Sequence, residues 1–316
     1  MNINSVSLVD CTLREGNQVP GVNFDVDESV KIAMRLSAIG VDYIEIGHPY
    51  ASEKEFNRVA AVCQVLPAAN ILSHARARYE DIDAVARAGA SWVGIFAGVN
   101  EYSQKYRLQR SQDQIFRIIA EAIRYAKKNG LAVRYTVEDA SRTSKEDLLK
   151  AYSVAMKSGA DRICFADSVG ANDPKSVNEI VSLLLQCFPE AKLEVHFHDD
   201  RGLALANALA AIAAGVTHVS CSVNGIGERS GITDTCTLIA NLVFLGVEEK
   251  FRAGCLMELS GAVSEITNVW PDAWRPVVGK NSFTHTSKLH VAASSRNEDC
   301  YHWIEPHLLG RSSNLL

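Results

Sequence analysis

The 316-residue sequence lacks the marks of a membrane or secreted protein. No apolar run approaches the roughly 18 residues that a membrane span needs. The first residues, MNINSVSLVD, show no basic segment followed by an apolar one, which argues against a signal peptide. The eight cysteines are scattered without a CxxC pair, as in a chain whose thiols stay reduced. We therefore expect a cytoplasmic protein that does not act at a membrane.

The sequence also lacks an excess of positive charge. Lys and Arg number 32 against 37 Asp and Glu, which gives a formal net charge of −5. This balance is unfavourable for a general nucleic-acid surface, so nucleic acid is not an expected partner. Hydrophobic residues make up 47% and charged residues 22%, which is ordinary for a globular enzyme and excludes a disordered chain.

Short apolar runs alternate with amphipathic stretches along most of the chain. Small turns with glycine, such as Ile39-Gly40-Val41, lead from one helix-like stretch into the next run. Eight such strand–helix units over about 250 residues predict an α/β fold, the (β/α)8 TIM barrel. A doubly wound sheet is the alternative, but no GxGxxG follows the first strand. The predicted strands are Val6–Cys11, Tyr43–Gly47, Ile71–His74, Trp92–Ala97, Ala132–Val137, Arg162–Ala166, Leu193–His198 and His218–Val223. The clearest predicted helices are Asp27–Ile39, Gln112–Lys128, Lys145–Lys157, Pro174–Cys187 and Ala204–Ala214.

The pattern changes near residue 249. The alternation of strand, glycine and helix stops there, and Trp270, Pro271, Trp274 and Pro276 mark a linker. The remaining residues are too few to build a core of their own. We expect residues 1–248 to form the catalytic barrel, and residues 249–316 to form a linker and a short C-terminal extension that packs on the barrel or on a neighbouring subunit.

Polar side chains gather where predicted strands end, which is where TIM barrels carry their active sites. The first strand runs into DCTLREGNQ, residues 10–18, which contains an arginine, an acid and an amide but could equally be a polar loop. The seventh strand ends in HFHDD, where His196 and His198 share one face because side chains alternate along a strand. Two imidazoles and a carboxylate make a divalent metal site with open positions. A packed or solvent-facing histidine pair is the alternative.

The fifth strand carries three polar residues, Arg134, Thr136 and Glu138, on one face. A barrel interior does not bury an arginine and a glutamate without partners or a ligand. Either Arg134 and Glu138 form an internal ion pair, or the planar fork of Arg134 binds a substrate carboxylate. After the eighth strand, three glycines within residues 224–231 allow the backbone to approach a ligand closely.

Together, four segments resemble the metal-dependent DRE-TIM family of acyl-CoA condensing enzymes and lyases: DCTLREGNQ, IEIGHPYASE, HFHDDRGLALAN and NGIGERSGIT. The family includes isopropylmalate and homocitrate synthases, hydroxymethylglutaryl-CoA lyase and 4-hydroxy-2-oxovalerate aldolase. The resemblance implies that Glu15, His196 and His198 hold a divalent metal cation, and Zn, Mn, Mg, Co and Fe all suit this ligand set. It also implies that Arg14 polarises the substrate carbonyl.

Two features resemble the Claisen-condensing synthases, which are acyltransferases, rather than the lyases. Gly227-Glu228-Arg229 stands where the lyases carry a cysteine loop. Residues 279–290 resemble the synthase motif GKNxFxHxSGxH, although Lys288 replaces its glycine. The resemblance implies a homodimer with exchanged C-terminal tails, in which His290 and Tyr301 enter the partner's active site and help to activate acetyl-CoA.

The choice of acceptor is open between two synthase types. Arg134, Thr136 and Glu138 resemble the homocitrate synthases, in which the arginine holds the distal carboxylate of 2-oxoglutarate. Segments 80–83 and 139–143 are closer to isopropylmalate synthase, and Arg78 stands where homocitrate synthases have a substrate-contacting histidine. We expect condensation of acetyl-CoA with a 2-oxo acid, first of all a 2-oxo diacid; isopropylmalate or citramalate synthesis, or lyase or aldolase chemistry, is the alternative. Glu138 joins the expected catalytic residues, and the expected substrate-binding residues are Gln18, Arg78, Arg134, Thr136 and Ser168.

Overall fold

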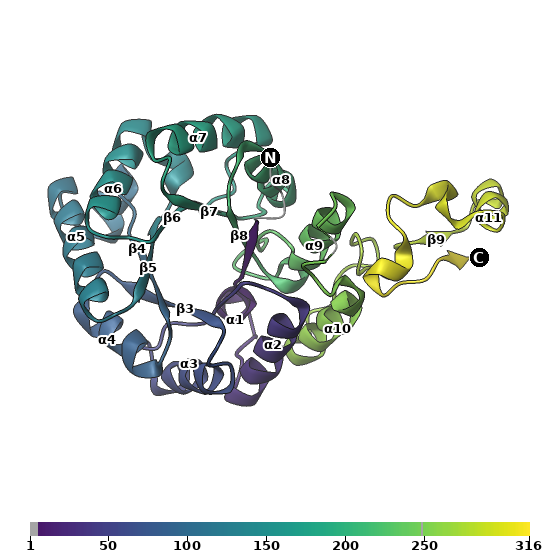
Figure 1. Ribbon diagram of the computed structural model, residues 1–316, viewed down its shortest axis with the longest axis horizontal. Helices are drawn as coiled ribbons and strands as arrows, with labels where there is room; N and C mark the ends of the chain where they lie inside the picture. The colour runs from purple at the N-terminus through teal and green to yellow at the C-terminus, as the bar shows by residue number, and fades with distance from the viewer. Residues whose placement is uncertain (1–5, 248) are drawn as a thin grey trace.

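The computed structural model describes residues 6–247 and 249–316. Eight parallel strands follow one another in chain order and close into a barrel, with β1 pairing β8. Figure 1 shows the ring of helices around these strands. The predicted TIM barrel is confirmed. The strands are β1 (Ser7–Asp10), β2 (Tyr43–Glu45), β3 (Asn70–Arg76), β4 (Trp92–Phe96), β5 (Ala132–Val137), β6 (Arg162–Asp167), β7 (Lys192–Phe197) and β8 (His218–Cys221).

Local capping signals set the helix ends. Asp25 and Ser111 form capping boxes at the starts of α2 and α5, and Pro174 opens α7. Gly40 ends α2 in a left-handed conformation that glycine adopts without a Cβ penalty. The helices are α1 (Thr12–Glu15), α2 (Val26–Ile39), α3 (Glu53–Val65), α4 (Tyr79–Ala88), α5 (Gln112–Lys128), α6 (Lys145–Lys157), α7 (Pro174–Cys187), α8 (Ala204–Ala214), α9 (Thr235–Phe244), α10 (Leu256–Thr267) and α11 (Lys288–Ser294).

The amino-terminal end of the barrel is closed by side chains from the even-numbered strands. Tyr43, Trp92, Arg162 and His218 are the first residues of β2, β4, β6 and β8. The guanidinium carbon of Arg162 lies 4.0 Å from the ring centroid of Tyr43 and 4.4 Å from that of Trp92, and the two rings meet edge to face. Alternate strands supply such layers in TIM barrels. A ligand therefore reaches the interior from the opposite end.

The C-terminal tail, defined here as residues 272–316, extends away from the barrel in Figure 1. It carries α11 and a small parallel sheet of β9 (Thr284–His285) and β10 (Asn314–Leu315). Arg275 attaches its base to the barrel by donating to the backbone carbonyl of Asn224 at 3.0 Å. The predicted domain boundary between residues 248 and 249 stays a prediction, because residue 248 lies outside the described residues. The helix α10, which follows this boundary, packs against α2 of the barrel.

The structure bears on two expectations, that the chain has no membrane span and that its thiols stay reduced. Within the described residues, no helix combines the length and apolar character that crossing a bilayer demands. All eight cysteines are free thiols. The cytoplasmic location itself stays a prediction.

Candidate active site

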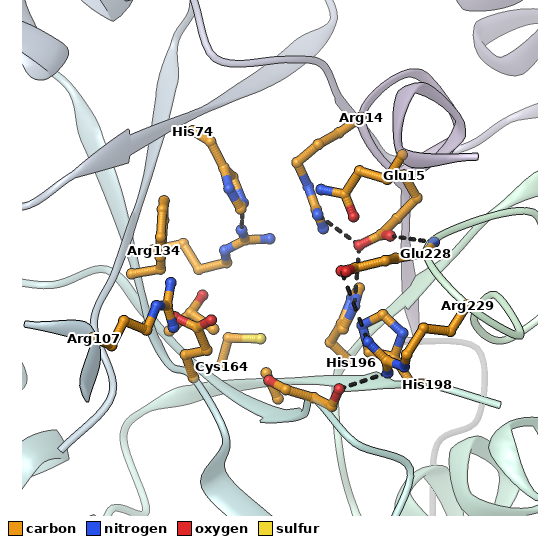
Figure 2. Close-up of a pocket in the computed structure, with 16 residues that line it drawn as sticks. Arg14, Glu15, His74, Arg107, Arg134, Cys164, His196, His198, Glu228 and Arg229 are labelled. Atoms are coloured by element: carbon orange, nitrogen blue, oxygen red, sulfur yellow. Dashed lines mark hydrogen bonds and ion pairs between the residues drawn. The ribbon is translucent and has the colours of Figure 1, made fainter. Parts of the chain in front are cut away.

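A cavity of about 500 Å³ opens at the carboxyl ends of the barrel strands (Figure 2). It brings together nine residues that the sequence analysis selected: Arg14, Glu15, Gln18, Arg134, Thr136, Glu138, Ser168, His196 and His198. The other lining residues are His74, Phe96, Arg107, Cys164, Ala166, Glu228 and Arg229. Three selected residues, Arg78, His290 and Tyr301, do not line this cavity.

The predicted metal ligands converge at one side of the cavity. Glu15 ends α1 directly after β1, His196 lies in β7, and His198 follows that strand. One ligand atom from each residue lies within 4.8 Å of the others, and all three side chains are buried. Nε2 of His196 is 3.5 Å from Oε1 of Glu15. Nδ1 of His198 is buried and has no hydrogen-bond partner among the described residues.

The charge states of Glu15 and His198 suit a cation. Burial alone would raise the pKa of Glu15, but Arg14 and the hydrogen bond with His196 hold it well below its ordinary value. Burial, together with the neighbouring His196, lowers the pKa of His198 to about 4. Glu15 is therefore ionised and His198 neutral near pH 7, which are the forms that bind a metal. Two nitrogens and one carboxylate leave open coordination positions, as catalytic metal sites require. The residues present fit a divalent cation.

Arg14 lies beside the three ligands and reaches into the cavity (Figure 2). Its guanidinium pairs with Glu15 and with Glu45 of β2. Burial would lower its pKa, but these two carboxylates raise it, so the side chain stays charged. The two ion pairs fix the positively charged guanidinium of Arg14 beside the metal ligands.

Arg134 occupies the centre of the barrel. Its Nη1 pairs with Glu45 of β2 and donates to Glu194 of β7 at 2.8 Å. Glu194 also accepts a hydrogen bond of 2.8 Å from Arg162 at the amino-terminal end of the barrel. Burial would raise the pKa of Glu45 and of Glu194, and the arginines lower both. The predicted alternative of an Arg134–Glu138 ion pair is wrong. The barrel brings carboxylates of two other strands onto Arg134, whereas Glu138, which directly follows β5, pairs with Arg107.

His74 of β3 is a site residue that the sequence analysis missed. Its Nε2 lies 2.7 Å from Nη2 of Arg134 and 3.1 Å from Glu45. Burial, together with the charges of Arg14 and Arg134, lowers its pKa to about 4, so the ring is neutral near pH 7. Glu45 and Glu194 were missed as well. The signal for all three was a titratable residue inside an apolar strand, with Glu194 two positions before His196 and so on the same face.

A side chain at Gly94 would collide with this buried network. A Cβ there would lie 2.8 Å from Nη2 of Arg134 and 3.0 Å from Cδ2 of His74. We expect Gly94→Ala to lower the free energy of unfolding by about 1–3 kcal/mol, measured by denaturant titration. Gly261→Ala in α10 is the control, because nothing lies within 4 Å of a Cβ there and alanine favours a helix. Equal stability of the two variants would contradict the packing described for Arg134.

The outer edge of the cavity carries Glu138 and Arg107, which form an ion pair. Arg107 ends the π-helical turn η3 (Ser103–Arg107), and the sequence analysis missed it. Arg78 lies beyond this edge and lines a neighbouring cavity. The expected role of Arg78 in substrate selection therefore stays a prediction, and His74, unlike Arg78, lines the cavity that holds the metal-ligand group.

The glycine-rich segment after β8 folds tightly over the metal ligands. Gly231 has a φ of +80°, and a Cβ there would lie 1.8 Å from the carbonyl oxygen of Gly225, so this position requires glycine. The backbone N–H of Glu228 points to Glu15 at 3.5 Å, and Arg229 forms two hydrogen bonds of 2.8 Å with Asp200. The backbone here packs closely against the chain itself, and its predicted approach to a ligand stays a prediction.

His290 and Tyr301 lie together in the tail. Their rings stack with centroids 4.0 Å apart. Tyr301 is 48% exposed, and Trp274 and Leu289, elsewhere in the tail, are 82% and 79% exposed. The pair is thus preassembled on a segment that leaves its own barrel.

The sequence of the chain matches a known protein family. The model of the HMGL-like family matches residues 5–263. A homocitrate synthase of Pyrococcus abyssi is 39% identical over 308 residues, which cover 98% of this chain and 85% of that protein. The chain belongs to the HMGL-like family. The DRE-TIM resemblance is thereby confirmed.

Other members of the HMGL-like family are similar over nearly the same length. A 2-isopropylmalate synthase of Sulfurisphaera tokodaii is 37% identical over 317 residues, covering 100% of this chain and 82% of that protein. A solved hydroxymethylglutaryl-CoA lyase of Pseudomonas aeruginosa aligns with a TM-score of 0.75 and 20% identity, over 84% of this chain and 93% of that one. The HMGL-like relatives with the higher identities thus carry synthase names, and the lyase shares the fold.

Proposed function

We propose that the chain is an acyltransferase that condenses acetyl-CoA with a 2-oxo acid, in a reaction that depends on a divalent metal cation. The observation that carries the proposal is the buried group of Glu15, His196 and His198 with Arg14 beside it. The names of the relatives at 37–39% identity, homocitrate synthase and 2-isopropylmalate synthase, support the same class of reaction.

The residues at the cavity divide the work of binding and charge stabilisation. Glu15, His196 and His198 would hold the cation, which, when bound, supplies Lewis-acid polarisation of the acceptor's carbonyl group. Arg14 places a fixed positive charge where negative charge develops on the keto oxygen during attack. Its carboxylate partners keep it in place before the reaction, so little reorganisation is needed.

Removal of the methyl proton of acetyl-CoA requires a base at the outer edge of the cavity. Glu138 lies at this edge and is 27% exposed, so it is open to an imidazole that enters from outside. In our proposal the partner subunit's tail brings His290 and Tyr301 to this point, since the two rings already stack on a segment that extends from the barrel. The enolate attacks the keto carbon, and hydrolysis of the thioester then releases CoA.

The wall opposite the metal ligands favours an acceptor with a second carboxylate. Arg134, His74 and Thr136 line it, and Phe96 is the large apolar side chain there. Oγ1 of Thr136 and Nε of Arg134 are buried without a hydrogen-bond partner among the described residues. Buried polar groups normally have partners, so these atoms support a polar ligand group at this wall. Arg134 would contribute its charge while Glu45 and Glu194 fix its orientation. Gln18 and Ser168, on the rim, are the further candidates for contact with the acceptor.

The acceptor class can be tested by release of free CoA thiol. We expect a higher kcat/KM with 2-oxoglutarate or oxaloacetate than with 2-oxoisovalerate, and no release without an added 2-oxo acid. Preference for 2-oxoisovalerate would instead identify the chain as an isopropylmalate synthase. Failure of every 2-oxo acid, with cleavage of 3-hydroxy-3-methylglutaryl-CoA instead, would assign it to the lyases.

Thr136→Val offers a sharper test of the distal subsite than removal of Arg134. Loss of Arg134 would leave Glu45 and Glu194 buried without a full set of partners, at a cost of about 3–5 kcal/mol in stability. Oγ1 of Thr136 makes no hydrogen bond with the described residues, so its removal leaves no buried carboxylate unpaired there. We expect Thr136→Val to keep its stability while kcat/KM for the diacid falls about tenfold, as for a lost hydrogen bond to a charged group. An equal fall for 2-oxoisovalerate would argue against a distal-carboxylate subsite.

A further inference from the structure

A second cavity, of about 880 Å³, adjoins the active-site cavity. The two share Phe96, Arg107 and Glu138 as lining residues, so they meet at the outer edge where the proton-transfer groups of the proposed function lie. Leu108 and Ile118 add apolar surface to its wall. The metal ligands and Arg14 are absent from its lining. A long ligand can therefore occupy both spaces, with its reactive end beside the metal group and its other end here.

The rim of the second cavity carries two arginines without acidic partners. Arg78 immediately precedes α4, and Arg110 lies between η3 and α5. Both are exposed and line the cavity, and among the described residues neither side chain has an ion pair or a hydrogen bond. Arg76 beside them differs, because Asp81 neutralises it in a two-point contact of 2.8 and 2.9 Å. The charge left uncompensated at this rim is thus specifically that of Arg78 and Arg110.

We infer that Arg78 and Arg110 bind the phosphate groups of the acyl thioester co-substrate, with its nucleotide end in the second cavity. The inference rests on the proposed function, which requires acetyl-CoA to reach the shared edge. The diphosphate and the ribose phosphate of CoA carry the negative charge that two free guanidinium groups match. The pantetheine arm would then pass over Phe96 and the apolar wall into the active site. Arg78 thereby selects the thioester and not the 2-oxo acid.

The test compares acetyl-CoA with S-acetyl-N-acetylcysteamine, a thioester that lacks the nucleotide and all phosphates. In the double variant Arg78→Glu/Arg110→Glu, we expect the KM for acetyl-CoA to rise tenfold or more. The KM for the 2-oxo acid and kcat/KM for the truncated thioester should stay within twofold of the wild-type values. Arg117→Glu/Arg124→Glu is the matched control: it makes the same charge change at two exposed positions of α5 outside the cavity lining, and should leave all three constants unchanged.

Ionic strength gives a second readout. Salt screens exposed charges over about 8–10 Å, so the KM of the wild type for acetyl-CoA should rise with added salt, and that of the double variant should rise less. An unchanged KM for acetyl-CoA in the double variant would overturn the inference, and so would equal losses with the truncated thioester. If the proposed function itself were wrong, the wild type would release no thiol with any 2-oxo acid, and this result distinguishes the two cases.

Discussion

His198→Ala should lose bound divalent metal and activity together while the barrel stays folded. Nδ1 of His198 has no hydrogen-bond partner among the described residues, so removal of the ring leaves no group there unsatisfied, yet it deletes one of three converging ligands. Lewis-acid catalysis is worth several kcal/mol, and each 1.36 kcal/mol is a factor of ten in rate. We expect kcat to fall by about three orders of magnitude. Elemental analysis of the purified variant and a thiol-release assay measure the two losses.

A surface histidine provides the control for that experiment. His307 has a side chain that is 72% exposed and lies in the tail, so His307→Ala should keep both metal and activity. Circular dichroism checks the fold of each variant. His196→Ala should behave as His198→Ala does. Full metal content in both active-site variants would show that the cation binds elsewhere.

Mixing two inactive variants should restore activity if the tails are exchanged. His198→Ala disables the barrel side of a site, and His290→Ala disables the tail side. In a hybrid dimer with exchanged tails, one site combines an intact barrel with an intact tail, and the other site carries both changes. Random reassociation of equal amounts should therefore recover about a quarter of the wild-type activity. The assay follows thiol release after the mixed subunits are unfolded and refolded together.

Two measurements make the mixing experiment decisive. Native mass spectrometry of differently tagged subunits shows whether hybrid dimers form. Tyr301→Phe, paired with His198→Ala in the same way, tests whether the stacked partner of His290 belongs to the same side of the site. Hybrids that form but stay inactive would show that each chain uses its own tail, or none.

The fold was predictable because its signals are local and repeated. The predicted bounds of α5 to α8 agree with the structure, since each of these helices has an amphipathic or apolar pattern that ends at a capping or turn residue. Strand ends were less accurate. The third strand was predicted as Ile71–His74 and spans Asn70–Arg76, because pairing with β2 begins it at Asn70 and pairing with β4 extends it to Arg76.

The site was predictable where it follows from one strand and its neighbouring loop. His196 and His198 share a face through the two-residue period of β7, and that period is visible in the sequence. The partners of Arg134 were not predictable in this way. Glu45 lies 89 residues away and Glu194 60 residues away, and closure of the barrel alone brings β2, β5 and β7 together. The Arg107–Glu138 pair depends likewise on how the turn η3 folds back over the barrel mouth.

The central claim is carbon–carbon bond formation between acetyl-CoA and a 2-oxo acid at the group of Glu15, His196 and His198. Its most direct test incubates the protein with isotopically labelled acetyl-CoA, the preferred 2-oxo acid and a divalent cation, and identifies the products by mass spectrometry. We predict a labelled hydroxy acid with one carboxylate more than the acceptor, formed in equal amount to free CoA, and no product after chelation of the metal. Free CoA accompanied only by labelled acetate, or a labelled product whose formation is unaffected by the chelator, would contradict the account.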